Sequence, residues 1–188
     1  ILESSYGLAT GTGLYLFTRM AWDVKVNPDS ILTEYYQFCY GPAAPTVLLA
    51  QKELSTQANS LPKVIQLVKD GTGKLHLNER EQKCLTDYKA YLHYLKLLFD
   101  VRQQPGDGKP EASDKLMRFT YSIFQRMLVH PFPVSEYLKT RGPAREYIKK
   151  NWDYKIPGSK EMQFYSVKQL NDAEIEAFFE EDANSLKQ

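Results

Sequence analysis

The sequence predicts an all-α protein built as an irregular bundle of six to eight helices. Three observations predict this fold class. Capping boxes at Asn78 and Asn171 mark the starts of two helices. Asn27 followed by Pro28 marks the start of another, since these residue types favour the N-cap and the first helical position. Apolar residues recur every three or four positions through residues 79–102, in a stripe made of Cys84, Tyr88, Tyr91, Leu92, Leu95, Leu98 and Phe99.

The first sixty residues predict three consecutive helices joined by short turns. Residues 14–23 read as a strongly apolar helix, and the second helix begins at Pro28. Gly41 suits the left-handed position that follows a helix end. Pro42 cannot continue that helix but can begin the third, which we expect to reach Leu61.

Trp22 and Asp23 end the first helix. We expect Trp22 to be buried, because it continues the apolar face of that helix. Asp23 is expected to accept hydrogen bonds from backbone amides of the following turn. A helix that is apolar on most sides is usually buried on most sides. If the chain is part of a larger protein, we therefore expect an exposed apolar patch near the N-terminus, formed by Leu14, Leu16, Phe17 and Met20.

The remaining elements follow from turn and capping residues. Residues 62–77 fit either a short helix or a turn-rich segment. A helix at 79–102 is opened by Asn78 with Glu81, and a loop follows at 103–113. The next helix, at 114–129, is capped by Ser113 and ended by His130-Pro131-Phe132-Pro133. We then expect two shorter helices near 135–140 and 143–152, an extended segment at 153–170, and a last helix opened by Asn171 with Glu174.

The length of 188 residues fits one domain, or one domain with an appendage. We expect residues 1–152 to form the helical bundle. Residues 153–188 are expected to form an extended segment and a C-terminal helix, packed on the bundle or leading to a further domain. The chain starts at Ile1 without an initiator Met or a signal pattern, so we expect a fragment of a longer protein.

Composition argues against several classes of partner. The 24 basic and 23 acidic residues are nearly balanced, which gives no basic stripe for a nucleic acid. No apolar run approaches the roughly 20 residues of a membrane span. The 13 tyrosines are expected mostly at core edges, although rings of this kind also line carbohydrate surfaces. Cys39 and Cys84 lie in helical apolar patterns and are expected to be two buried thiols rather than a disulfide.

The sequence contains no pattern for a cofactor or a metal, and we expect neither. His76, His93 and His130 are far apart, with no cysteine or carboxylate at ligand spacing. Most carboxylates, among them Glu34, Glu53, Glu79 and Glu176, are expected to lie on solvated helix faces. Glu3 is the exception that we retain as a substrate-contact candidate. It follows Ile1-Leu2, which would fit the end of a strand in a preceding barrel. The alternative for Glu3 is a surface residue near a chain end.

The dipeptide Trp22-Asp23 and the run Tyr40-Gly41-Pro42-Ala43-Ala44 resemble a domain-of-unknown-function family of secreted bacterial proteins. Its members are multidomain and glycoside-hydrolase-like, and they are distantly similar to alpha-glucuronidases. In that family a barrel-like catalytic region precedes a helical region. The usual Pro after Trp-Asp is Val24 in this chain. The resemblance implies structural roles for Trp22, Asp23, Tyr40, Gly41 and Pro42, and it places the catalytic acids upstream of Ile1, so none is carried over.

The resemblance implies a non-catalytic helical accessory domain that buttresses the barrel of a carbohydrate-active protein. Its expected partners are that upstream barrel, a glycan ligand of the parent protein and a second copy of the chain. The expected location is periplasmic or extracellular in bacteria. The alternative is a stand-alone helical interaction module whose tyrosine-rich face binds another protein. An autonomous enzyme is the third reading, and no set of nucleophile, base and orienting group favours it.

Overall fold

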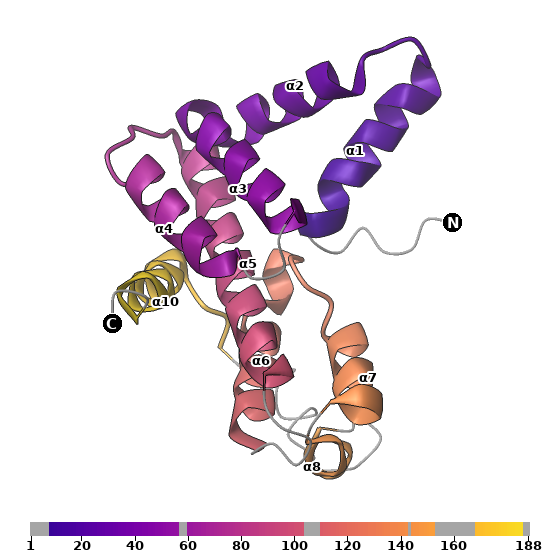
Figure 1. The fold of residues 1–188 in the computed structure, drawn as a ribbon, viewed down its shortest axis with the longest axis vertical. Helices are drawn as coiled ribbons and strands as arrows, with labels where there is room; N and C mark the ends of the chain where they lie inside the picture. Colours follow the sequence, from indigo (N-terminus) through magenta and orange to yellow (C-terminus); the bar gives the residue numbers. More distant parts are fainter. Residues whose placement is uncertain (1–7, 57–59, 104–109, 143, 153–167, 186–188) are drawn as a thin grey trace. The chain divides into compact units, whose positions relative to one another are not determined.

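A computed structural model describes residues 8–56, 60–103, 110–142, 144–152 and 168–185, and these residues form helices joined by turns (Figure 1). Within these ranges, eight α-helices contain between 11 and 24 residues, and one further α-helix is shorter. No strand occurs within the described ranges. The all-α fold class predicted from the sequence is therefore confirmed.

The chain divides into two compact units. The first comprises Ile1–Leu92 together with Asp172–Gln188, and the second comprises His93–Asn171. The boundary that we expected at residue 152 does not separate these units. The C-terminal helix α10 (Asp172–Ser185) belongs with the N-terminal residues, because it packs against α4 (Leu61–Thr72).

The first unit is a layer of helices packed in chain order. It contains α1 (Leu8–Trp22), α2 (Pro28–Tyr40), α3 (Ala44–Thr56), α4, the first half of α5 (Glu79–Arg102) and α10. Each helix from α1 to α3 packs on the next one in the chain. Their apolar faces form a core that includes Ile31, Val47, Val64, Leu85 and Phe179, each no more than 2% exposed.

The predicted starts of α2 and α5 are confirmed in atomic detail. Asn27 Oδ1 accepts a hydrogen bond from the Asp29 amide at 2.9 Å, and Pro28 is the first residue of α2. At the start of α5, Asn78 Oδ1 accepts from the Glu81 amide at 3.0 Å. Glu81 Oε2 accepts from the Asn78 amide at 3.0 Å in return. Each cap provides a partner for backbone amides that a helix start leaves unpaired.

The third predicted helix is shorter in the structure than we expected. The residues from Gly41 to Ala43, which include Pro42, form a short 3-10 turn, and α3 begins only at Ala44. The α3 helix ends at Thr56, and α4 begins at Leu61. Pro62 fits the first turn of α4, because it has no amide hydrogen that would need a partner there.

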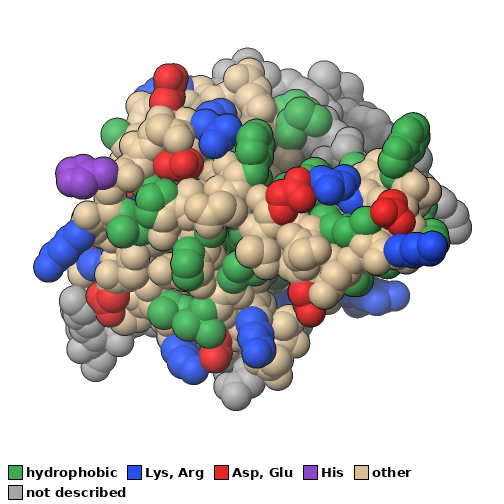
Figure 2. All heavy atoms as spheres, turned by 90° about the horizontal axis from the view of Figure 1, so that it is seen from above, with side chains coloured by type: hydrophobic (Ala, Val, Ile, Leu, Met, Phe, Trp, Pro, Cys, Tyr) green, Lys and Arg blue, Asp and Glu red, His purple; other side chains and the backbone are tan. Residues whose placement is uncertain are grey.

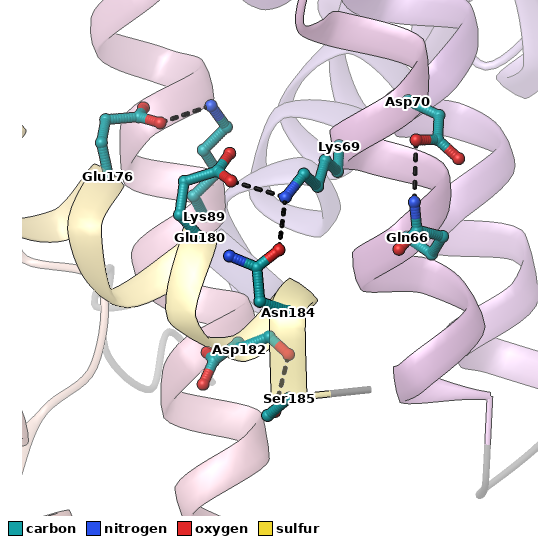
Figure 3. A network of polar contacts seen from close by, with 9 residues as sticks. All are labelled: Gln66, Lys69, Asp70, Lys89, Glu176, Glu180, Asp182, Asn184 and Ser185. Carbon is teal, nitrogen blue, oxygen red and sulfur yellow. Dashed lines mark hydrogen bonds and ion pairs between the residues drawn. The ribbon is translucent and has the colours of Figure 1, made fainter. Parts of the chain in front are cut away.

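Ion pairs fasten α10 to α4 and α5 (Figure 3). Lys89 Nζ on α5 lies 2.6 Å from Glu176 Oε2 on α10. Lys69 Nζ on α4 lies 2.6 Å from Glu180 Oε2 and 3.1 Å from Asn184 Oδ1. Lys89 is only 9% exposed, so loss of Glu176 would leave a poorly hydrated charge without its partner, which costs more than at a surface lysine.

The second unit is organised around a buried tryptophan. It contains the second half of α5, α6 (Pro110–Ser122), α7 (Pro131–Arg141) and α8 (Arg145–Asn151). Trp152 is fully buried and stacks on Tyr121 with ring centres 6.0 Å apart. Its Nε1 donates to Asp114 Oδ1 at 2.9 Å. The Asp114 carboxylate also accepts from the Tyr147 hydroxyl at 3.0 Å and from Arg118 Nε at 2.5 Å.

The helix predicted for residues 114–129 has different limits in the structure. It begins at Pro110, so Ser113 lies inside α6 with a buried hydroxyl and is not the N-cap. It ends at Ser122, followed by a 3-10 turn and by Met127 with a φ of +55°. A non-glycine residue with positive φ cannot extend a right-handed helix, so the apolar pattern that continues past Ser122 belongs to a turn.

His130 begins a helix rather than ending one. Its Nδ1 accepts a hydrogen bond from the Phe132 amide at 3.1 Å, and Pro131 is the first residue of α7. The two shorter helices predicted near 135–140 and 143–152 are present as α7 and α8. Residues 153–167, where we expected an extended segment, lie outside the described part of the chain.

Acidic and basic side chains are interspersed on the face shown in Figure 2. On the face shown in Figure 2, aspartates and glutamates lie close to lysines and arginines, in keeping with the near-balanced composition. This face therefore presents no broad field of one sign to a nucleic acid. Among the helices that the structure describes, none has both the length and the apolar character needed to cross a bilayer.

Candidate functional site

The two motifs that carry the family resemblance lie at opposite ends of α2. Trp22 and Asp23 precede the turn into α2, whereas Gly41 and Pro42 follow its last residue, Tyr40. The 13 residues of α2 span roughly 20 Å at the rise of an α-helix. The motifs therefore do not form one site. Glu3, the substrate-contact candidate, lies outside the described residues.

Our prediction that Trp22 is buried is wrong, because its side chain is 94% exposed. The α1 helix packs on α2 through Thr12, Tyr15 and Arg19, which share one helical face. Trp22 is the last residue of α1 and extends beyond these contacts. Helical periodicity identifies the side chains that share a face, but it does not show that another element covers that face.

Asp23 has the role that we predicted for it. Its Oδ1 accepts a hydrogen bond from the Lys25 amide at 2.9 Å, and its own amide donates to the Arg19 carbonyl at 3.1 Å. An aspartate that bonds the backbone two residues onward stabilises a turn. Val24, at the position where the family usually has proline, is 80% exposed in that turn.

Tyr40 and Gly41 join the end of α2 to the start of α5. Tyr40 is 3% exposed, and its ring meets that of Tyr88 on α5 with centres 6.1 Å apart. Gly41 has a φ of +49°, so a residue with a side chain is strained there. A Cβ added to Gly41 would also collide with the carboxylate of Glu81. Position 41 therefore requires glycine both for its backbone conformation and for the space beside Glu81.

The outer face of α1 is apolar and exposed. Leu14 and Phe17 are 37% and 65% exposed, and they lie on the side of α1 turned away from α2. We call these two residues, together with Trp22 and Val24, the N-terminal apolar surface. Two of the four residues of the expected patch, Leu14 and Phe17, are exposed. Leu16, which belonged to the same expectation, is half-buried, and so is Met20.

The inner face of α1 is polar and paired with α2. Arg19 lies 2.6 Å from Glu34 Oε1, and the Tyr15 hydroxyl donates to the same oxygen at 2.9 Å. The hydrogen bond from Arg19, followed by that from Tyr15, lowers the pKa of Glu34 below its ordinary value. Because this cluster is open to solvent, it orients α1 on α2 more than it stabilises the pair.

Sequence reasoning missed a thiol cluster at the junction of α2 and α5. We use this name for Cys39, Cys84, Tyr35 and Arg80. The two thiols lie within hydrogen-bonding reach of one another, and both side chains are half-buried and reduced rather than fully buried as we expected. Tyr35 also hydrogen-bonds Cys39. No spacing rule links positions 39 and 84, so only the packing of α2 on α5 reveals the pair.

The thiols of the cluster differ in acidity. The hydrogen bond from Cys84 lowers the pKa of Cys39 to about 7, and the Tyr35 hydroxyl and the Arg80 charge act in the same direction against burial. The same hydrogen bond, together with burial, raises the pKa of Cys84. Burial and the nearby Cys39 raise the pKa of Tyr35 to about 12.

The carboxylates expected on solvated faces mostly have structural partners. Glu34 pairs with Arg19, and Glu53 pairs with Lys63 at 2.8 Å. Glu176 pairs with the buried Lys89 and is only half-exposed, so the expectation of a purely solvated role fails there. Within the described part of the chain, no group of three or more histidine, cysteine or acidic side chains could hold a metal ion.

No protein-family model, curated protein or solved structure matches this chain.

Proposed function

We propose that the chain is a non-catalytic helical accessory domain of a larger, glycoside-hydrolase-like protein. In this proposal it buttresses the catalytic barrel, and the parent protein is periplasmic or extracellular in a bacterium. The residues behind the proposal are those of the resemblance, Trp22-Asp23 and the run from Tyr40 to Ala44. The barrel, its glycan ligand and a second copy of the chain are the proposed partners.

The observation that carries the proposal is the N-terminal apolar surface. Phe17 and Trp22 expose 65% and 94% of their surface. Large apolar side chains with this much exposure often mark a surface that another protein element covers. We assign the role of the covering element to the barrel, because the surface lies on or next to the helix that would follow the barrel in the family's domain order. The surface then acts as a packing face, and no catalytic role is required of it.

The alternative of a stand-alone interaction module relied on a tyrosine-rich face. Three tyrosines of the α2–α5 region are buried, namely Tyr36, Tyr40 and Tyr88, at 6%, 3% and 0% exposure. They serve as core residues, so they are not available to bind a partner. The accessory-domain proposal uses different residues and does not depend on them.

The first experiment measures self-association and dye binding of the 188-residue chain. We expect binding of a hydrophobic dye and concentration-dependent association by light scattering, both reduced in a Phe17→Lys/Trp22→Lys variant. Phe132→Lys is the matched control, since Phe132 is 50% exposed but lies on α7. A monomer at high concentration that binds no dye would favour the stand-alone module.

The second experiment tests the absence of catalysis. We expect no turnover of a panel of glycosides by the purified chain, because glycoside hydrolysis needs two carboxyl groups held across the scissile bond. Turnover that one Asp or Glu substitution abolishes would overturn the proposal. Co-purification of the chain with its encoded upstream segment, expressed as a separate polypeptide, tests the barrel contact itself. The Phe17→Lys/Trp22→Lys variant should lose that contact.

A further inference from the structure

We propose that Cys39 and Cys84 form a reversible redox pair, in which a hydroperoxide oxidises Cys39 and Cys84 then closes a disulfide between α2 and α5. Neither the accessory role nor the resemblance requires such a pair. The inference rests on the positions of the two thiols, their exposure and the groups around them.

Three contacts between α2 and α5 flank the two cysteines and fix where the helices meet. Arg80 lies over the Phe38 ring at 4.1 Å, and the Glu81 carboxylate contacts Gly41. The ring of Tyr40 meets that of Tyr88, with centres 6.1 Å apart. On α5 these contacts lie one turn before and one turn after position 84. On α2 they lie immediately before and after position 39.

Positions 81, 84 and 88 share one face of α5, because residues three and four apart on a helix are neighbours. That face is directed at the end of α2, as the contacts of Glu81 and Tyr88 require. Cys84 is therefore held opposite Cys39, and the two thiols are within hydrogen-bonding reach. Proximity of the two side chains is the first requirement for a disulfide.

The surroundings divide the two thiols into an attacking and a resolving one. Arg80 favours a thiolate at Cys39, and the Tyr35 hydroxyl and the Cys84 thiol donate hydrogen bonds to it. The hydrogen bond with Cys39, followed by burial, raises the pKa of Cys84, so its thiol form is favoured. Both side chains are half-buried, so a small oxidant has access to them. Redox-sensitive cysteines typically combine an accessible thiolate with a neighbouring resolving cysteine.

The reaction balances with hydrogen peroxide as the oxidant. The Cys39 thiolate attacks one peroxide oxygen, the O–O bond breaks, and the leaving hydroxide takes up a proton to form water. Cys39 is then a sulfenic acid. The Cys84 sulfur attacks the Cys39 sulfur, the S–O bond breaks, and a second water leaves with the Cys84 proton. Two thiols and one peroxide thus give one disulfide and two waters, and a dithiol reductant reverses the change by thiol–disulfide exchange.

The direct test oxidises the reduced chain with stoichiometric hydrogen peroxide at low protein concentration. We expect loss of both free thiols, loss of two hydrogen atoms from the intact mass, and a peptide that links positions 39 and 84. Dithiothreitol should restore the starting material. Disulfides between molecules alone, or separate over-oxidation of each cysteine, would overturn the proposal. This test uses the wild-type chain, so its outcome does not depend on the folding of any variant.

Variants test the assigned roles. Cys84→Ser should stop the reaction at a Cys39 sulfenic acid that a cyclic diketone traps. The matched control is the variant Cys84→Ser/Lys83→Cys, which keeps two cysteines but moves one to an exposed position on α5. We expect no internal disulfide in the control, although its circular dichroism should match the wild type. An internal disulfide formed equally well in the control would refute the need for this geometry.

The order of attack is tested by alkylation of the wild-type chain with iodoacetamide at pH 7, followed by peptide mapping. We expect Cys39 to react at least about tenfold faster than Cys84, because a thiol with a pKa near the assay pH is about half ionised. The titratable groups near the pair are Tyr35, Tyr36 and Tyr40 from α2 and Arg80, Asp87 and Tyr88 from α5, with Glu81 at Gly41. The exposed Lys83 acts on Cys84 only through its charge. Equal rates for the two cysteines would refute the assigned roles.

Discussion

Gly41→Ala tests the junction between α2 and α5 more directly than any other single substitution. The change adds one carbon at a position where the structure makes two separate demands. The backbone has a φ of +49° and a ψ of −122°, a conformation that residues other than glycine rarely adopt. The added Cβ would also occupy the place of the Glu81 carboxylate, which caps the start of α5.

The expected cost is the sum of these two terms. Holding alanine in this backbone conformation costs about 1–3 kcal/mol. Displacing Glu81 breaks its hydrogen bond to the Asn78 amide, which costs about 0.5–1.5 kcal/mol. The total is about 1.5–4.5 kcal/mol of unfolding free energy. For a chain of this size each kcal/mol moves Tm by roughly 2–4 °C, so the midpoint should fall by roughly 3–18 °C.

The assay is urea denaturation followed by far-UV circular dichroism, carried out as a double-mutant cycle with Glu81→Ala. In the Glu81→Ala background the collision is absent, and Gly41→Ala should cost only the backbone term. A coupling of about 1 kcal/mol is expected between neighbouring residues of this kind. Equal costs in both backgrounds would show that the contact with Glu81 is not formed in solution.

Gly13→Ala is the matched control for the backbone term. Gly13 lies in α1, and a Cβ added there meets no atom within 4 Å. Alanine is the better helix former, so the control should stabilise the chain by about 0.5–1 kcal/mol. The same substitution therefore has opposite signs at the two positions. A neutral or stabilising Gly41→Ala would refute the reasoning about its backbone.

Three further substitutions have distinct expected outcomes. Trp22→Ala should change the unfolding free energy by no more than about 0.5 kcal/mol, since the side chain is 94% exposed, and a loss of several kcal/mol in urea denaturation would contradict that exposure. Trp152→Ala should cost about 3–5 kcal/mol by the same assay, because the ring is fully buried, and a near-wild-type midpoint would contradict its central place in the second unit. Glu176→Gln should cost about 1–3 kcal/mol, because it leaves the buried Lys89 without its opposite charge. Its control is Glu146→Gln, because Glu146 pairs with Lys149 and its side chain is 75% exposed. This control should leave the unfolding free energy nearly unchanged. Equal losses of unfolding free energy in Glu176→Gln and Glu146→Gln would refute the argument that burial of Lys89 sets the cost.

The features that sequence reasoning identified correctly depend on residues close together in the chain. Asn27, the pair of Asn78 with Glu81, and the turn at Asp23 act over two or three residues. Gly41 ends α2 with positive φ, as its position after an apolar helical pattern predicted. Local hydrogen bonds of this kind require no knowledge of tertiary structure, which explains why they were accessible.

The features that sequence reasoning missed depend on contacts between distant residues. Trp22 has the apolar character of a core residue, but no described helix covers it. Cys39 and Cys84 meet only because the end of α2 packs on the first turns of α5. The helix predicted at 114–129 extends past Ser122, because apolar residues continue at helical spacing there. That spacing contains no information on the positive φ of Met127.

The attachment of α10 to the first unit has a consequence for synthesis on the ribosome. Helices α1 to α4 and the start of α5 leave the ribosome well before α10, because roughly 80 residues separate Leu92 from Asp172. At 5–20 residues per second this interval lasts about 4–16 s. Lys69 and Lys89 have no partner on α10 during that time. The face of α4 that α10 covers in the folded chain is therefore open to solvent throughout this interval.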